Sequence, residues 1–177
     1  MENTRFVQDL QKNIYQYKNQ KFSDVVILCI GTNKLIGDSI GPVVGQKLKE
    51  ENIQEKICIY GDMKQTINFK NAKQVIEKIF KIYEKPFIIT IDSALGKQTM
   101  INKIVVNKGI IRIGKSLGRS ICYPSHITIK GVVGENKNTF EDNIAILKTV
   151  QPKLIWELSN TMVEGIKQEI GKIGIAN

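Results

Sequence analysis

The chain has 177 residues, a formal net charge of +9 and three cysteines. A chain of this length buries about two thirds of the surface that its unfolded form exposes, so it needs no disulfide or metal to stabilise a core. The sequence holds no apolar run near the ~20 residues that span a bilayer. Its first residues also lack the basic and apolar pattern of a signal peptide. We therefore expect a cytoplasmic single domain over residues 1–177 without a disulfide framework.

The positive charge is spread along the chain and does not form one block. Only three of the 26 basic residues are arginines, and the lysines alternate with glutamates in the segments that read as helices. Recognition of phosphate or guanine favours the bidentate guanidinium group. Direct nucleic-acid binding is therefore not expected as the primary function.

Hydrophobic spacing predicts that helices and strands alternate in the first half of the chain. The predicted helices are 5–17, 39–50 and 70–83, and the predicted strands are 24–30, 57–60 and 86–91. The second half is less regular. Segments 101–106 and 109–114 flank a turn signal and predict a hairpin or a pair of strands at the edge of the sheet. A strand at 126–133 and helices at 139–149 and 152–170 follow.

This order predicts an α/β fold, a three-layer α/β/α sandwich with a mixed, mostly parallel sheet. Residues 1–23 form a leading helix in this interpretation, and residues 24–170 form the core. We expect the sheet to position any functional groups at the carboxyl ends of its parallel strands, where ligands of such folds bind.

Two predicted strands lead into loops that hold an aspartate. Strand 24–30 precedes Asp38, and strand 86–91 precedes Asp92. Because the carboxyl ends of parallel strands line one crevice, these two carboxylates are expected to lie close together. Two structural alternatives stay open: Asp38 or Ser39 caps the next helix, and Asp92 binds neighbouring loop amides. The glycines near Asp38 do not have the spacing of a nucleotide-binding loop.

Cys122 and His126 offer a different chemistry. A cysteine beside a histidine can form a thiolate nucleophile, but catalytic cysteine and histidine usually come from distant parts of a sequence. Cys122 is therefore not expected to be catalytic. His126, the only histidine, either takes part in the reaction or is a satisfied core residue.

Three motifs together carry a family resemblance. They are Gly31-Thr32-Asn33 with Gly37-Asp38-Ser39-Ile40-Gly41-Pro42, Ile91-Asp92-Ser93-Ala94-Leu95-Gly96, and Met162-Val163-Glu164-Gly165-Ile166. The chain from about Asp24 to Ile170 resembles the YyaC-type family of sporulation proteins. That family is related to the germination protease of spore-forming bacteria and, more remotely, to the hydrogenase maturation endopeptidases.

The resemblance implies a phosphorylase/hydrolase-like fold in which Asp38 and Asp92 match the aspartates associated with activity in the germination protease. His126 occupies a place similar to that of the family's histidine, and Asn33, Ser39 and Ser93 are assigned to substrate binding. The hydrogenase maturation enzymes have an acidic residue where this chain has Ser39, so their metal set is incomplete here. No metal and no cofactor are therefore expected.

The function implied is that of a sporulation-linked peptidase which hydrolyses a protein substrate, such as small acid-soluble spore proteins, with an aspartate pair. Two close carboxyls can divide the roles of base and acid. We expect Asp92 to be the base, and Asp38 either to orient the water or to protonate the leaving amine. One alternative is a non-catalytic relative that binds a peptide or small ligand in the same crevice. Another is a basic accessory protein that acts on DNA-coating proteins. A pro-segment role for residues 1–23 and a homo-oligomer are both left open.

Overall fold

The structure is a computed structural model that describes residues 2–51, 53, 57–113 and 121–175. Its helices are α1 (Glu2–Tyr15), α2 (Ile40–Glu50), α3 (Ala72–Ile82), α4 (Phe140–Thr149) and α5 (Pro152–Glu169). Its strands are β1 (Val25–Cys29), β2 (Ile57–Tyr60), β3 (Phe87–Gly96), β4 (Ile104–Lys108), β5 (Ile111–Ile113), β6 (Ile121–Tyr123) and β7 (Ile127–Glu135). Within the described ranges, no helix is both long enough and apolar enough to cross a membrane.

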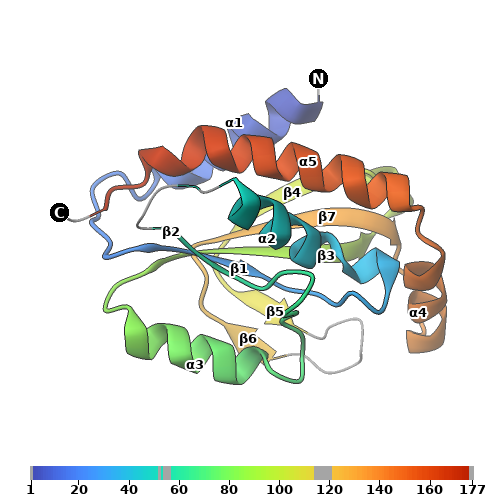
Figure 1. The fold of residues 1–177 in the computed structure, drawn as a ribbon. Helices are drawn as coiled ribbons and strands as arrows, with labels where there is room; N and C mark the ends of the chain where they lie inside the picture. Colours follow the sequence, from blue (N-terminus) through green and yellow to red (C-terminus); the bar gives the residue numbers. More distant parts are fainter. Residues whose placement is uncertain (1, 52, 54–56, 114–120, 176–177) are drawn as a thin grey trace.

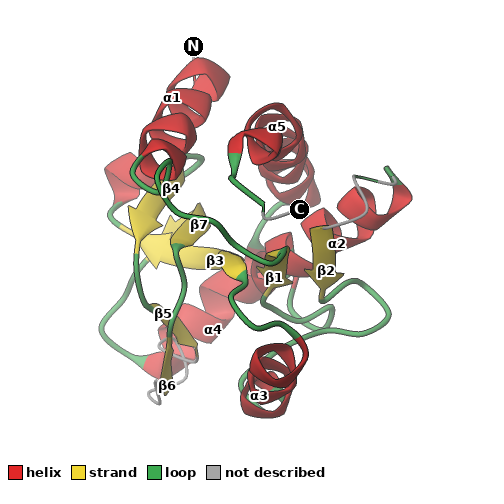
Figure 2. Cartoon of the chain, turned by 90° about the vertical axis from the view of Figure 1, so that its left-hand side faces the viewer, coloured by secondary structure: helices red, strands yellow, loops and turns green. Residues whose placement is uncertain are grey.

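Five strands form one mixed sheet in the order β2-β1-β3-β7-β4. The first four are parallel, and β4 runs antiparallel to β7. Helices α1, α2 and α5 lie on one side of this sheet, and α3 lies on the other side together with the β5–β6 ribbon (Figures 1 and 2). The predicted α/β/α class and the mostly parallel sheet are confirmed.

Strand β1 is buried along its whole length because both of its faces are covered. Val25, Ile27 and Cys29 pack in the large core cluster beneath α1, α2 and α5. Val26 and Leu28 pack in the smaller cluster beneath α3. This two-sided burial explains why the strand reads as an unbroken apolar run instead of an alternating one.

The predicted hairpin between segments 101–106 and 109–114 is wrong. Gly109 does form a turn, with a φ of 87°, but the strands that flank it enter different sheets. β4 pairs with β7, and β5 pairs with β6, a strand that the sequence pattern did not reveal. Ile104 and Val106 on β4 pack against the large core cluster, and this burial favours pairing with β7 over pairing with β5.

Strand β3 is longer than predicted. It continues past Ile91 to Gly96, and β7 runs beside it up to Glu135. β1 is shorter, because its last partner in the register is Cys29, opposite Ile91. Residues 92–96 of β3 therefore extend beyond the end of β1, and Asp92 lies within a strand instead of in the loop that follows one.

Two glycines determine how the chain leaves β1. Gly31 has a φ of 145°, and a Cβ there would lie 2.2 Å from the Asp38 carbonyl oxygen. A Cβ on Gly41, in the first turn of α2, would lie 2.0 Å from the Ile30 carbonyl oxygen. The first turn of α2 thus packs directly on the end of β1, and the loop that carries Asp38 closes tightly over it.

We predict that Gly41→Ala destabilises the protein by about 1–3 kcal/mol, because the new methyl group meets rigid backbone and not a movable side chain. Thermal or denaturant unfolding measures the loss. Lys78→Ala, at an exposed position of α3, is the control and should change stability by less than about 0.5 kcal/mol. Equal effects of the two substitutions would contradict this packing argument.

Candidate active site

Asp38 is the last residue of a short 3₁₀ turn, Ile36–Asp38, that lies against β3. Its carbonyl oxygen accepts a hydrogen bond of 2.8 Å from the Thr32 N–H, which closes the loop, and its side chain is half-buried. Ser39 is the N-cap residue of α2, but its hydroxyl donates to the Ile36 carbonyl over 2.7 Å and makes no capping bond. The side-chain cap that the structural alternative requires is not observed at Ser39.

Asp92 lies on the part of β3 that extends past β1. Its Oδ1 accepts a hydrogen bond of 2.9 Å from the Ser93 N–H, which is a bond of the kind that the structural alternative for Asp92 predicts. Asp92 is also the register partner of Lys130 on β7. Paired residues of neighbouring parallel strands project from the same face, so the ammonium group of Lys130 belongs to the surroundings of Asp92.

The two carboxyl groups influence each other's ionisation. Burial raises the pKa of Asp92 to about 7, although Lys130 and the Ser93 N–H both lower it. Burial and the negative charge of Asp92 raise the pKa of Asp38 to about 8, although the Thr32 N–H lowers it. Burial is the largest cause of both shifts, and the charge on Asp92 further opposes the ionisation of Asp38. Both carboxyls therefore keep their protons to a higher pH than an exposed aspartate does.

The three residues assigned to substrate binding differ in whether their side chains already form hydrogen bonds within the protein. Asn33 is exposed and donates to the Met63 carbonyl over 3.0 Å, and the Ser39 hydroxyl is bound to Ile36. The Ser93 Oγ is buried and has no hydrogen-bond partner among the described residues. Ser93 is thus the one of the three whose side chain retains its full hydrogen-bonding capacity.

The structure separates His126 from the aspartates. His126 precedes β7 and lies level with Ile88, whose backbone N–H donates to the His126 Nδ1 over 2.9 Å. Ile88 is four residues before Asp92 on β3, a separation of about 13 Å along a strand. The imidazole stacks on Phe87, with centroids 4.6 Å apart, and meets the edges of further aromatic rings. It has the surroundings of a satisfied core histidine.

Cys122 does not share those surroundings. It is exposed and lies in the separate β5–β6 pair, opposite Arg112. Because the Nδ1 of His126 accepts from Ile88 and its ring is enclosed by aromatic side chains, the described residues do not provide the thiol–imidazole hydrogen bond that an activated cysteine requires.

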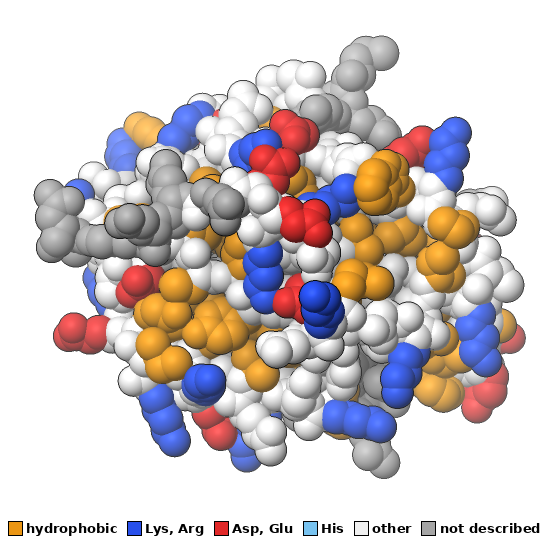
Figure 3. Space-filling view, in the orientation of Figure 1, with side chains coloured by type: hydrophobic (Ala, Val, Ile, Leu, Met, Phe, Trp, Pro, Cys, Tyr) orange, Lys and Arg blue, Asp and Glu red, His pale blue; other side chains and the backbone are white. Residues whose placement is uncertain are grey.

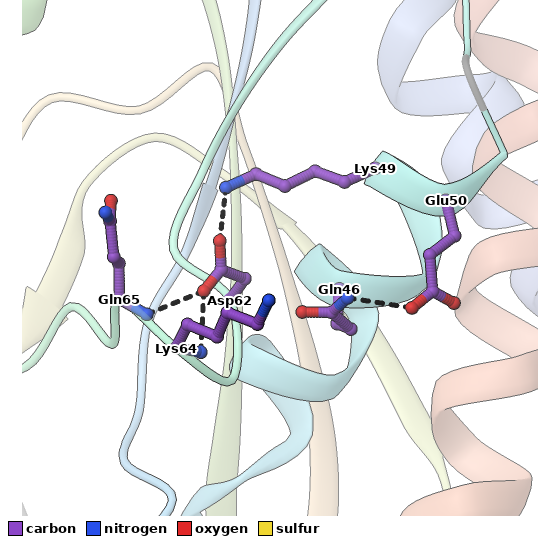
Figure 4. Close-up of polar contacts among 6 residues, drawn as sticks. All are labelled: Gln46, Lys49, Glu50, Asp62, Lys64 and Gln65. Atoms are coloured by element: carbon purple, nitrogen blue, oxygen red, sulfur yellow. Dashed lines mark hydrogen bonds and ion pairs between the residues drawn. The ribbon is translucent and has the colours of Figure 1, made fainter.

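Asp62 is a third aspartate at the carboxyl end of a parallel strand, and the sequence analysis did not single it out. It follows β2 and is anchored by Lys49 at 2.5 Å and by the backbone N–H groups of Lys64 and Gln65 at 2.7 and 2.6 Å (Figure 4). Burial acts to raise its pKa, but these hydrogen bonds outweigh that effect and lower it. The sequence pattern that could have revealed this residue is a predicted strand followed directly by Gly61 and Asp62. Asp62 holds a loop in place and stays ionised.

A resident metal does not fit this site. No group of three or more His, Cys, Asp or Glu side chains in the described part of the chain is arranged to hold an ion. Ser39, next to Asp38, donates its own hydroxyl to the Ile36 carbonyl, and His126 lies level with Ile88, four residues before Asp92 along β3.

The same fold occurs in proteases that mature hydrogenases. The NiFe hydrogenase maturation protease HycI from Thermococcus kodakarensis KOD1 superposes with a TM-score of 0.58 over 89% of this chain and 99% of that chain, at 16% sequence identity. HybD, a second NiFe hydrogenase maturation protease from Thermococcus kodakarensis, gives a TM-score of 0.41 over 80% of this chain and 97% of that chain, at 14% identity. The first likeness establishes a shared α/β architecture.

Residues 1–165 match the family described as "Protein of unknown function (DUF1256)". The chain belongs to this family. It is also 28% identical, over 142 residues, to the uncharacterized protein YyaC of Bacillus subtilis (strain 168), a match that covers 80% of this chain and 67% of that protein. The resemblance to YyaC-type proteins is confirmed, and so is the remote relation in fold to the hydrogenase maturation proteases.

The raised pKa values predict that the aspartate pair reduces stability at neutral pH. When folding raises the pKa of a carboxyl, its contribution to stability is complete at pH values below the ordinary pKa of 3.8. That contribution is lost as the pH rises through the pKa of the folded state, about 7 for Asp92 and about 8 for Asp38. Asp92→Asn should therefore be more stable than wild type at pH 8 by about 1–2 kcal/mol, once solvent screening of a half-exposed group is allowed for. The gain should disappear near pH 4. A gain that does not depend on pH would contradict the shifted ionisation.

His126 predicts the opposite pH dependence. Burial and the nearby Lys85 lower its pKa below 6.5, so its contribution to stability is complete above pH 6.5 and is lost as the pH falls through the pKa of the folded state. His126→Asn keeps an acceptor for the Ile88 N–H but does not titrate. Unfolding measured from pH 7 to pH 5 should show that wild type loses stability relative to this variant. A constant difference between the two proteins would contradict the lowered pKa of His126.

Proposed function

We propose that this protein is a peptidase-like hydrolase that uses Asp38 and Asp92 to cleave an amide bond in a protein substrate. The single observation that carries the proposal is the placement of two partly buried carboxyls near each other: Asp92 lies on β3, and the turn that carries Asp38 lies against β3, so that the charge on Asp92 raises the pKa of Asp38. Base and acid are then available together near pH 7, as general acid–base catalysis requires. The fold shared with HycI, which is a protease, gives independent support.

In the proposed reaction the Asp92 carboxylate takes a proton from a water molecule as the water oxygen attacks the amide carbonyl carbon. A tetrahedral intermediate forms, and Asp38 donates its proton to the amide nitrogen as the C–N bond breaks. The products are a carboxylic acid and an amine, and a proton passes from Asp92 to Asp38 through solvent to restore the starting state. Lys130 acts on this cycle by favouring the ionised form of Asp92.

The biological setting we propose follows from the relation to YyaC-type proteins. The protein acts in the cytoplasm of a sporulating cell on a protein substrate, for which small acid-soluble spore proteins are the first candidates. Its own surface carries lysines beside acidic side chains on the face shown in Figure 3, without one continuous basic area. This distribution favours a protein substrate over direct binding to nucleic acid.

Replacing either aspartate by asparagine should abolish turnover and leave the fold intact. Each substitution removes a group that transfers a proton, and such groups contribute about 10²–10⁴ to a rate. Asp24→Asn, at the opposite end of β1, is the matched control and should keep wild-type kcat. Cleavage of small acid-soluble spore proteins, followed by mass spectrometry with thermal unfolding in parallel, measures both properties. Full activity in both Asn variants would overturn the aspartate pair. Binding of these proteins without cleavage by wild type would favour the non-catalytic relative.

The pH profile of kcat/KM should be bell-shaped, with limbs near pH 7 and pH 8 that belong to the pair as a whole. Lys130→Gln removes a positive charge that lowers the pKa of Asp92, so the acidic limb should move to higher pH. Lys103→Gln, which changes another half-buried lysine, should leave the profile in place. A profile that does not respond to Lys130→Gln would remove Lys130 from the site.

A further inference from the structure

The part of β3 that extends beyond β1 is a strand with one open edge. The register of β1 on β3 ends at the pair Cys29 and Ile91, whereas the register of β7 on β3 continues to Gly96 and Glu135. β1 occupies one side of β3 along residues 87–91. On that same side, no described strand pairs with residues 92–96. These residues are also half-exposed. About 17 Å of strand edge is therefore available, at ~3.3 Å per residue.

The backbone groups on this edge are not used by the sheet. Ile91 directs its carbonyl toward β1, where it accepts from the Ile30 N–H over 2.8 Å. Backbone groups alternate between the two sides of a strand, so Ser93 directs its N–H and C=O to the same open side. The Ser93 N–H already donates to the Asp92 Oδ1, so an added strand either replaces this bond or pairs with the Ser93 C=O and the backbone groups of Leu95. An unpaired edge of this kind is a template for another strand.

We propose that an extended segment of the substrate adds to this edge as one more strand, beside the residues 92–96 of β3. The inference rests on the proposed function and specifies its substrate: an unfolded stretch of about five residues and not a folded surface. Main-chain hydrogen bonds supply most of the affinity in this mode of recognition. The specificity for side chains is therefore broad, and substrates are selected mainly by being extended and accessible.

The position of the catalytic groups identifies the substrate as the occupant of this edge. Asp92 belongs to the open segment itself, and the turn that carries Asp38 lies against β3. A peptide paired with residues 92–96 brings its own amide bonds alongside the two carboxyls. The other edges of the sheet belong to β2 and β4, neither of which carries a residue of the pair. The two hollows along α5 are lined from α2 and from the region of β4, and they too are separate from the aspartates.

Hydrogen exchange of the full chain tests where a peptide binds. The probe is a short synthetic peptide that wild type cleaves or, if it cleaves none of a set of unstructured peptides, the one that it retains most tightly. Binding to the Asp38→Asn variant, which keeps the peptide intact, should slow the exchange of the Ser93 and Leu95 amides at least about tenfold, because these two face the open side. The amides of Ala94 and Gly96, which face β7, should stay unchanged. Amides of β2 and β4 serve as internal controls and should not change. Protection confined to β2, to β4 or to the α2–α5 surface, or no protection at all, would overturn the inference.

A second measurement uses the same peptide with single N-methyl groups along its backbone. Pairing with a strand uses every other peptide N–H, so methylation at alternate positions should weaken binding about tenfold while the intervening positions tolerate it. Effects without this period of two would also overturn the inference. Cleavage without protection of Ser93 and Leu95 would leave the proposed hydrolase intact and refute only the added strand. Protection without cleavage would support the added strand and refute the hydrolase.

Discussion

The close packing of the first turn of α2 on the end of β1 is the constraint on which the rest of the site depends. A side chain at Gly41 would overlap the backbone of Ile30, so the helix and the strand can approach this closely only through a glycine. The approach forces the chain to leave the sheet at Gly31 and stops β1 at Cys29. β3 and β7 have no such restriction, and they continue. The difference in strand length exposes the edge that carries Asp92 and brings the turn with Asp38 against it.

The electrostatic properties of the site follow from the same geometry. Both carboxyls are removed from bulk water by the tight loop and by the extended strands, so burial dominates the shift of each pKa. Lys130 lies next to Asp92 across the β3–β7 pair and makes Asp92 the more acidic of the two. Asp62 shows the contrast. It is also buried at the carboxyl end of a parallel strand, but an ion pair and two backbone N–H groups compensate its charge. The compensated charge of Asp62 keeps its pKa low, whereas compensation at Asp38 and Asp92 is weaker than the effect of burial and leaves their pKa values raised.

The sequence predicted the features that depend on local periodicity. The buried strand at 24–30 and the amphipathic helices are read directly from the spacing of apolar residues. The order of strand, loop and aspartate predicted that Asp38 and Asp92 lie close together; the structure places Asp92 within β3 instead of in a loop, and the joint role of the two residues stays a prediction. Features that depend on long-range pairing were not accessible in this way. The partner of β4 is decided by the burial of Ile104 and Val106 against distant segments, and the length of β3 is decided by β7. Lys130 gave no signal, because its role comes only from its register with Asp92. The family resemblance implied a place for His126 in the site, but the structure locates it beside Ile88, four residues before Asp92 on β3.

The central claim is that Asp92 and Asp38 ionise one after the other near neutral pH because the turn that carries Asp38 lies against the segment of β3 that carries Asp92. Carbon-13 NMR of the aspartate carboxyl groups, assigned with the Asp38→Asn and Asp92→Asn variants, measures this most directly. The account predicts two coupled titrations, near pH 7 and pH 8, and predicts that the remaining aspartate of each variant titrates in a single step. In Asp92→Asn, the pKa of Asp38 should fall, since the charge that opposes its ionisation is gone. Titration of both carboxyls near pH 4, with no response of either to the loss of the other, would contradict the account.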